Sequence, residues 1–171
     1  MIETERLVLR PFVESDAEDV VEYLHQPAVH CFNSMKLDSL EAAKAEMKKR
    51  AKDEFYLAIV LKDSGKVIGE IFGNPEGTGP EDETLDTFSP CWMLNLAYGG
   101  KGYAYEAASF MIPIVAKEYG LKRFQAEILP ENLPSKALIE KLGFRFEQVI
   151  RNAHEFGTMS RDILLYVLEV K

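Results

Sequence analysis

The pattern of apolar and polar residues predicts strands along the whole chain. Residues 6–10 alternate between polar and apolar, and they are followed by Pro11, which lacks a backbone donor and ends the expected strand. Residues 55–61 and 67–72 are mostly apolar and enclose the turn signal Asp63-Ser64-Gly65, so they predict a hairpin. Four later segments also have the pattern of strands, at 88–96, 123–129, 144–151 and 162–170.

Helices are predicted between these strands, at 15–25, 38–52, 103–119 and 134–142, where apolar residues recur at three-and-four spacing. The first two expected helices begin with the spacing of a capping box. In the first helix the pair is Ser15 with Glu18, and in the second it is Asp38 with Glu41. This order of elements predicts an α/β (α+β) fold with a mixed sheet, antiparallel hairpins, one parallel crossover and helices on both faces.

The length of 171 residues and the lack of internal repeats predict a single domain over residues 1–171. No apolar run approaches the roughly 20 residues that span a bilayer. The first residues carry neither a basic patch nor an apolar stretch before a cleavage site. We therefore expect a cytoplasmic protein that has no membrane partner.

The net charge of −8 and the pI near 5.0 argue against nucleic acid as a partner, because phosphate binding needs a basic surface. A cationic substrate is more compatible with this charge. The segment 73–86 is acidic and has no Lys or Arg, so it either attracts a cationic amine or is a solvated loop. The cysteines and histidines show no ligand spacing, and no metal is expected.

Three glycines in four positions mark the segment Gly99-Gly100-Lys101-Gly102-Tyr103-Ala104, between a predicted strand and a predicted helix. Glycines let the backbone approach a ligand, and a helix start offers N–H groups and a positive dipole end, so the pattern favours an anion site. The alternative is a turn that only connects the two elements. A Walker loop would need Ser or Thr after Lys101, and a dinucleotide fingerprint would need glycine at Tyr105, so a nucleotide-binding protein is disfavoured.

A second segment carries a more specific signal: Asn132-Leu133-Pro134-Ser135, continued by Glu140-Lys141-Leu142-Gly143-Phe144. Together with the glycine-rich loop and the opening segment 3–11, it resembles the GNAT N-acetyltransferase superfamily. Within that superfamily it is similar to the branch of ribosomal-protein N-terminal acetyltransferases, over nearly the whole chain. The resemblance implies a mostly antiparallel central sheet of about seven strands, with a splayed parallel strand pair that holds acetyl-CoA.

The same resemblance implies which residues bind acetyl-CoA, the expected co-substrate. The loop amides would hold the pyrophosphate, a strand would pair with the pantetheine arm, and an asparagine and a serine would contact the cofactor. These residues are Leu94, Leu96, Gly99, Gly100, Lys101, Gly102, Tyr103, Ala104, Asn132 and Ser135. Asn132 and Ser135 also fit the alternative of ordinary residues at a helix start. The family usually has Gln or Arg at the position of Gly99, so one side-chain anchor is missing.

Three residues are candidates for the chemistry. Ser135 is expected to protonate the departing thiolate, because Ile139 stands where many superfamily members have a tyrosine. The acceptor amine must be neutral to attack the thioester, so a base is needed directly or through water. Glu70 and Glu127, on predicted strands, are the two candidates for that base.

The expected activity is transfer of an acetyl group from acetyl-CoA to a primary amine by direct attack in a ternary complex. The amine would belong to a protein N-terminus or to a small molecule, and the sequence does not select between them. The alternative function is a non-catalytic acyl-CoA-binding module that acts as a sensor or in interactions. The oligomeric state is open, and a homodimer is one of the expected assemblies.

Overall fold

The computed structural model describes residues 1–27, 34–77, 85–156 and 159–170. Its strands are β1 (Ile2–Glu3), β2 (Leu7–Pro11), β3 (Leu57–Leu61), β4 (Val67–Glu76), β5 (Thr87–Leu94), β6 (Arg123–Ile128), β7 (Arg145–Phe156) and β8 (Met159–Glu169). Its α-helices are α1 (Ala17–Leu24), α2 (Leu40–Arg50), α3 (Tyr103–Tyr119) and α4 (Leu133–Lys141). Short 3-10 helices, η1 (Glu14–Asp16) and η3 (Leu96–Tyr98), precede α1 and follow β5. The elements follow the order predicted from the sequence.

The strands hydrogen-bond in the order β1-β2-β3-β4-β5-β6-β8-β7. The pairs β1/β2, β2/β3, β3/β4, β6/β8 and β7/β8 are antiparallel, whereas β5 and β6 are parallel. The expected fold class, a mixed and mostly antiparallel sheet with one parallel pair, is therefore confirmed. The described residues form eight strands rather than about seven, because the two-residue strand β1 is too short to give a periodic pattern.

The chain divides into two compact units. The first contains Met1–Phe72 and Trp92–Phe110, and the second contains Gly73–Cys91 and Met111–Lys171. β4, β5 and α3 each contribute residues to both units.

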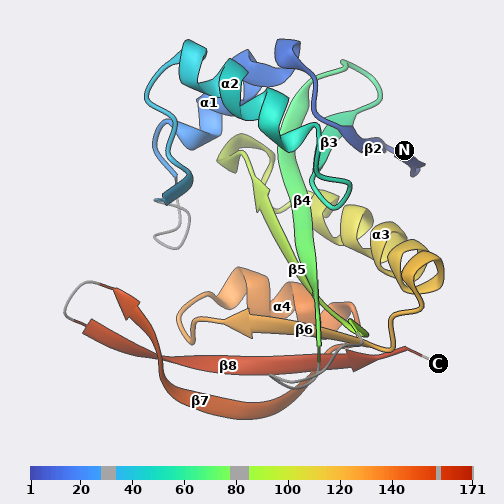
Figure 1. The fold of residues 1–171 in the computed structure, drawn as a ribbon, viewed down its shortest axis with the longest axis vertical. Coiled ribbons are helices and arrows are strands. Elements are labelled where there is room, and N and C mark those ends of the chain that lie inside the picture. Colours follow the sequence, from blue (N-terminus) through green and yellow to red (C-terminus); the bar gives the residue numbers. More distant parts are fainter. Residues whose placement is uncertain (28–33, 78–84, 157–158, 171) are drawn as a thin grey trace. The chain divides into compact units, whose positions relative to one another are not determined.

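The core of the first unit lies where α1 and α2 pack together and cover β3 and β4 (Figure 1). Apolar residues of α1 and α2 that recur at three-and-four spacing make up the helical side of this core, as the sequence pattern predicts. Val20, Leu24 and Met47 are fully buried there, with Ala58 and Val67 on the strands. This core cluster contains no residue from the loop after β5 or from the start of α3.

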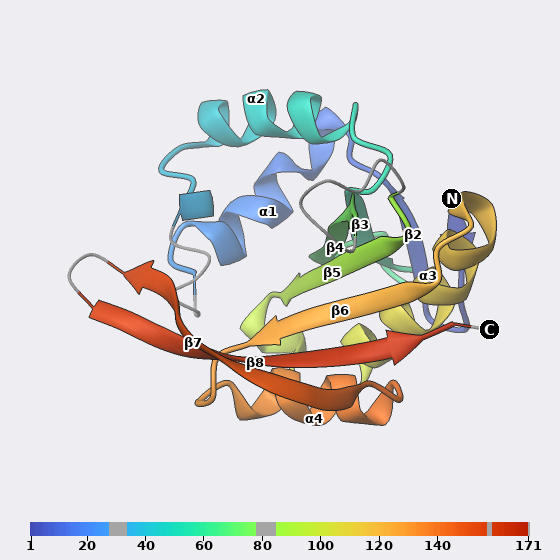
Figure 2. The same cartoon turned by 60° about the horizontal axis from the view of Figure 1, so that its bottom comes forward.

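In the second unit, β6 lies between β5 and β8, and β7 lies on the far side of β8 (Figure 2). Phe88 of β5 and Phe124 of β6 are fully buried, with ring centroids 5.7 Å apart. α4 packs on β6, and its Ile139 is fully buried. None of the helices in the described ranges is long and apolar enough to cross a membrane.

The capping box predicted at Ser15 is wrong. The 3-10 helix η1 precedes α1, and the Asp16 carboxylate accepts a hydrogen bond from the Val13 N–H at 2.8 Å. The same carboxylate forms an ion pair with Arg10 of β2 at 2.7 Å. The ion pair with Arg10 favours Asp16 over Ser15 as the residue that accepts hydrogen bonds at this helix start. The spacing of a capping box does not reveal this ion pair.

The second predicted capping box is displaced by one residue. α2 begins after Ser39, whose hydroxyl accepts a hydrogen bond from the Ala42 N–H at 3.1 Å. Asp38 lies outside the helix and forms an ion pair with Lys36 at 2.7 Å. Two good capping residues stand side by side here, so the sequence alone does not decide between them.

The strands that flank the acidic segment also end at other residues than predicted. β4 continues to Glu76, so the connection after it starts later than residue 73. β5 ends at Leu94, and the prediction that its strand includes Leu96 is wrong, because Leu96 opens η3. Residues 78–84, which hold most of the acidic side chains of that segment, lie outside the described residues.

Candidate active site

The glycine-rich loop combines two unusual backbone conformations. Gly100 and Gly102 have φ angles of 73° and 82°, in the left-handed region where a side chain is strained. Gly99 has a φ of −63°, so its conformation does not require glycine. The two left-handed residues turn the chain from η3 into α3 within a few positions.

The loop presents its amides at the N-terminus of α3, where the first N–H groups of a helix have no acceptor within the helix. The Glu106 N–H makes the first helical bond, to the Gly102 carbonyl at 3.0 Å. Within the described ranges, the N–H groups of Gly100, Gly102, Tyr103 and Ala104 donate no hydrogen bond to the protein. These four donors and the positive end of the helix dipole fit a bound pyrophosphate.

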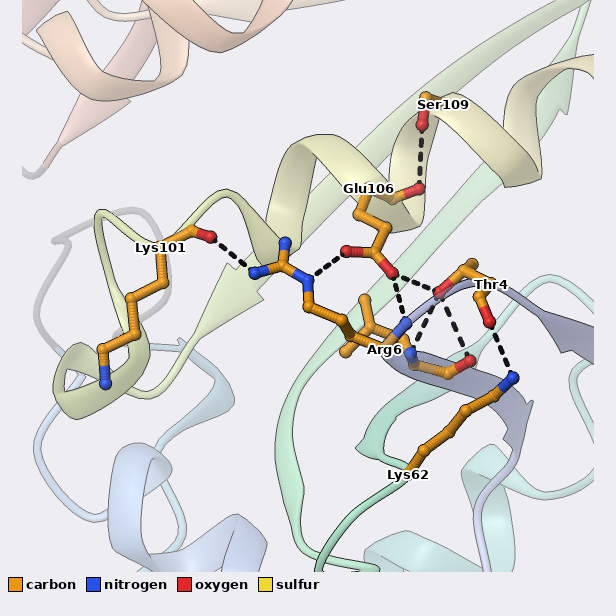
Figure 3. Close-up of polar contacts among 7 residues, drawn as sticks. Thr4, Arg6, Lys62, Lys101, Glu106 and Ser109 are labelled. Atoms are coloured by element: carbon orange, nitrogen blue, oxygen red, sulfur yellow. Dashed lines mark hydrogen bonds and ion pairs between the residues drawn. The ribbon is translucent and has the colours of Figure 1, made fainter.

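Lys101 interacts with the preceding turn through its side chain. Its ammonium lies 3.2 Å from the Ala97 carbonyl and 5.3 Å from the centroid of the Tyr98 ring. Its own carbonyl accepts a hydrogen bond from Arg6 at 3.1 Å, on the side of the loop opposite to the ammonium (Figure 3). In this arrangement the positive charge of Lys101 is directed toward η3.

The end of β5 brings Leu94 close to β4 within the first unit. A Cβ on Gly69 would stand 2.2 Å from the Met93 carbonyl and 2.6 Å from a methyl of Leu94, so only glycine fits at that point of β4. The Asn95 N–H donates to the Ile68 carbonyl at 2.8 Å, and the Asn95 side chain caps η3 by accepting from the Ala97 N–H at 3.0 Å. Asn95 therefore determines where the strand stops, and sequence reasoning missed it.

Glu70, a predicted base, is fully buried in the first unit. Arg50 of α2 forms an ion pair with its carboxylate, and the hydroxyls of Tyr23 and Tyr56 each donate to it at 3.2 Å. Burial raises the pKa of Glu70, against the opposing effects of Arg50 and the two tyrosines. Burial and the nearby carboxylate also raise the pKa values of both tyrosines, so they remain hydrogen-bond donors.

Arg50, the ion-pair partner of Glu70, is not among the residues predicted from the sequence. Its side chain is only 3 % exposed, on the buried side of α2 with Ala43 and Met47. The available signal was the spacing of three and seven residues that places Arg50 on the apolar face of this helix. A charged residue at such a position requires a buried partner.

The remaining predicted residues lie in the second unit. Glu127 is exposed on β6 between the buried residues Ala126 and Ile128. Asn132 caps α4, because its side-chain oxygen accepts from the Ser135 N–H at 3.3 Å. Ser135 is half-buried in the first turn of α4. The side-chain oxygen of Asn132 is therefore used as a helix cap, as in the alternative interpretation from the sequence. The amide nitrogen of the same side chain still has two hydrogens to donate.

The parallel strand pair is short. β5 and β6 pair only at Thr87 with Arg123 and at Phe88 with Phe124, although both strands continue beyond these residues. On its other edge, β6 pairs with β8 over all six of its residues. The backbone of β5 after Phe88 is therefore not paired with β6, as expected for a splayed pair.

The family model for an acetyltransferase (GNAT) domain matches residues 6–145 of this chain. The chain belongs to the GNAT acetyltransferase family. It is an acetyl-CoA-dependent N-acetyltransferase, as the sequence motifs predicted. It is 32% identical to the uncharacterized N-acetyltransferase YnaD of Bacillus subtilis (strain 168), over 98% of this chain and 95% of YnaD.

Solved structures show the same fold. The crystal structure of a GNAT-family acetyltransferase from Bacillus anthracis has a TM-score of 0.86 and 27% sequence identity, and the match covers 98% of this acetyltransferase and 97% of that chain. RimL, a ribosomal L7/L12 alpha-N-protein acetyltransferase solved in complex with coenzyme A, has a TM-score of 0.76 and 14% identity. That match covers 98% of this chain and 96% of RimL, and it concerns the fold alone.

Proposed function

We propose that this acetyltransferase binds acetyl-CoA on the loop Gly99–Ala104 and transfers the acetyl group to a primary amine by direct attack in a ternary complex. The observation that carries the proposal is a set of four loop amides at the N-terminus of α3. Two of these amides belong to the left-handed residues Gly100 and Gly102. One family model that spans residues of both compact units supports a single acetyltransferase domain over residues 1–171.

The residues of this chain would have distinct tasks. The amides of Gly100, Gly102, Tyr103 and Ala104 hold the pyrophosphate, and Gly99 and Lys101 complete the loop. Leu94 offers backbone groups to the pantetheine arm, and its N–H is a candidate donor to the thioester oxygen, where negative charge develops. Leu96, which is 75% exposed on η3, supplies apolar surface next to the loop.

The role of the residues in the second unit is proposed from the motif and not from their position. Asn132 would hydrogen-bond the cofactor through its amide nitrogen, since its oxygen caps α4. Ser135 would return a proton to the thiolate of coenzyme A. Glu70 and Glu127 are the candidate bases, of which Glu127 is exposed and Glu70 is fully buried.

The acceptor class follows from charge and from the relatives. The acidic composition favours a cationic amine in solution. RimL is named as acting on a ribosomal protein N-terminus, and we propose the same class, a protein or peptide α-amine, ahead of small-molecule amines. The amine must lose its proton before it can attack the thioester, and the base must be deprotonated to accept that proton. The rate should therefore rise with pH until both the amine and the base are deprotonated.

The test is an acetyl-transfer assay with purified protein, acetyl-CoA and a panel of peptides with free N-termini, polyamines and small amines. Thiol release reports turnover, and the mass of the acceptor reports the added acetyl group. Turnover with at least one α-amine peptide, above the rate of acetyl-CoA hydrolysis, is expected. Tight acetyl-CoA binding without turnover on any acceptor would contradict the catalytic proposal and favour a non-catalytic acyl-CoA-binding module.

A further inference from the structure

Thr4 and Arg6, which precede β2, form hydrogen bonds with the carboxylate of Glu106 in the first turn of α3. Glu106 accepts hydrogen bonds from the Thr4 hydroxyl at 2.5 Å, from the Arg6 N–H at 2.8 Å and from Arg6 Nε at 2.7 Å (Figure 3). The Glu106 side chain is 12 % exposed. Partial burial alone would raise its pKa, but the hydrogen bonds from Thr4 and Arg6 outweigh burial and lower the pKa below its ordinary value.

Arg6 also reaches the glycine-rich loop. Its Nη1 donates to the Lys101 carbonyl at 3.1 Å, and its guanidinium lies 4.4 Å from the centroid of the Tyr103 ring. Its Nη2 lies 3.6 Å from the point where a Cβ on Gly102 would stand. One guanidinium thus joins the start of the chain, the first turn of α3 and the loop itself.

We propose that Arg6 is a positioning residue for the cofactor loop, because it neutralises Glu106 and fixes the peptide between Lys101 and Gly102. The inference rests on the proposed binding of acetyl-CoA to this loop. Arg6 acts through Glu106 and the Lys101 carbonyl, and its task is complete before the cofactor binds.

The first part of the argument concerns charge. A carboxylate in the first turn of a helix is attracted to the same positive end that would bind a phosphate, so an unpaired Glu106 would compete with the pyrophosphate and repel it. The ion pair with Arg6 at 2.7 Å cancels this charge. The remaining positive potential at the loop then comes from the amides and the helix end.

The second part concerns direction. In a trans peptide the carbonyl and the following N–H point in opposite directions, and the described chain contains no cis peptide. Because the Lys101 carbonyl points at Arg6, the Gly102 N–H points to the other side of the loop. Arg6 thereby aims one of the four proposed pyrophosphate donors.

The experiment measures acetyl-CoA affinity and steady-state kinetics for Arg6→Met, Glu106→Gln and the double variant. Arg6→Met should raise the Kd and the KM for acetyl-CoA at least tenfold, with kcat at saturation changed less than twofold. Glu106→Gln alone should change the Kd less than threefold. Since the double variant lacks the uncompensated carboxylate, it should recover part of the affinity lost in Arg6→Met, while the loss of the bond to the Lys101 carbonyl remains.

Lys62→Met is the matched control, because Lys62 holds the same segment by donating to the Thr4 carbonyl at 2.6 Å without a contact to Glu106 (Figure 3). It should leave the affinity within twofold. An unchanged Kd in Arg6→Met would overturn the proposal, and so would a double variant as weak as Arg6→Met, since the unpaired Glu106 carboxylate would then cost no affinity. A wild-type protein that binds no acetyl-CoA would instead refute the proposed function.

Discussion

At the scale of single residues, Glu70 and Arg50 form a buried ion pair in the first unit. Both side chains are almost completely removed from water, and two tyrosines donate to the carboxylate. Removal of one partner of a buried ion pair leaves a charge without compensation, which costs about 3–5 kcal/mol. The stability of the α1/α2 core is therefore expected to depend on this pair.

Arg50→Met should lower the free energy of unfolding by about 3–5 kcal/mol, as measured by chemical denaturation. Burial already raises the pKa of Glu70, and loss of Arg50 removes an opposing effect. A carboxyl whose folded pKa is raised loses stability as the pH rises from its ordinary value near ~4.3 through the folded value. The deficit should therefore be smaller at acid pH than at neutral pH, and a pH-independent deficit would show that Arg50 does not change the folded pKa of Glu70.

The two candidate bases can be separated by the same kind of substitution. Glu127 is exposed, whereas the Glu70 carboxylate is enclosed by Arg50, Tyr23 and Tyr56. We expect Glu127→Gln to lower kcat about 100-fold. Glu70→Gln should mainly change stability, and a large loss of kcat in a folded Glu70→Gln protein would reverse this assignment.

At the scale of elements, the close approach of β4 and β5 at Gly69 sets the position of Leu94. An alanine methyl there would overlap the Met93 carbonyl and Leu94, so the strands would have to move apart. Gly69→Ala should cost about 2–3 kcal/mol of unfolding free energy and lower kcat, since the Leu94 N–H is displaced.

Gly65→Ala is the control for Gly69→Ala. Gly65 lies in the turn between β3 and β4 with a φ of 71°, and a Cβ there would meet nothing within 4 Å in the described part of the chain. Only the left-handed backbone is strained, which costs about 1 kcal/mol. Equal effects of the two substitutions on activity would show that the β4/β5 contact does not position the reacting groups.

The sequence predicts the elements well and their ends less well, for a physical reason. Apolar periodicity identifies α1 and α2 because one face of each helix is buried. The β3/β4 hairpin is identified by two apolar runs around a turn signal, because β3 is buried at every residue and β4 at its first five. The ends depend on side-chain hydrogen bonds that apolar periodicity does not encode, such as those between Arg10 and Asp16, or on a choice between neighbouring caps, as at Ser39. Asn95, which ends β5, has the same effect through a local bond to Ala97.

The candidate site shows the same contrast. The glycine-rich loop is recognisable because left-handed conformations at Gly100 and Gly102 restrict the residue type. The partners Arg6 and Glu106 are 100 residues apart in the sequence, and nothing in local spacing joins them. Long-range ion pairs of this kind become visible only in the folded chain.

At the scale of the whole molecule, a ligand that binds only the folded state should stabilise it. Acetyl-CoA at 100 times its Kd is expected to add about 2.7 kcal/mol to the free energy of unfolding. Free coenzyme A should give a similar gain, because the proposed loop contacts the pyrophosphate that both molecules share. If neither acetyl-CoA nor coenzyme A raised the melting temperature of the protein, that result would contradict the assignment of the loop as the pyrophosphate site.

The most direct test of the central claim is calorimetric titration of acetyl-CoA into the wild type, Gly100→Ala and Gly120→Ala. Gly100 and Gly120 have similar φ angles of 73° and 66°, and neither position has another described heavy atom within 4 Å of the added methyl, so the folding cost should match. Gly120 follows the last residue of α3, whereas Gly100 belongs to the loop before it. Affinity that falls at least tenfold in Gly100→Ala and less than twofold in Gly120→Ala is predicted. Equal affinities in all three proteins, or no binding by the wild type, would contradict the assignment of the loop as the pyrophosphate site.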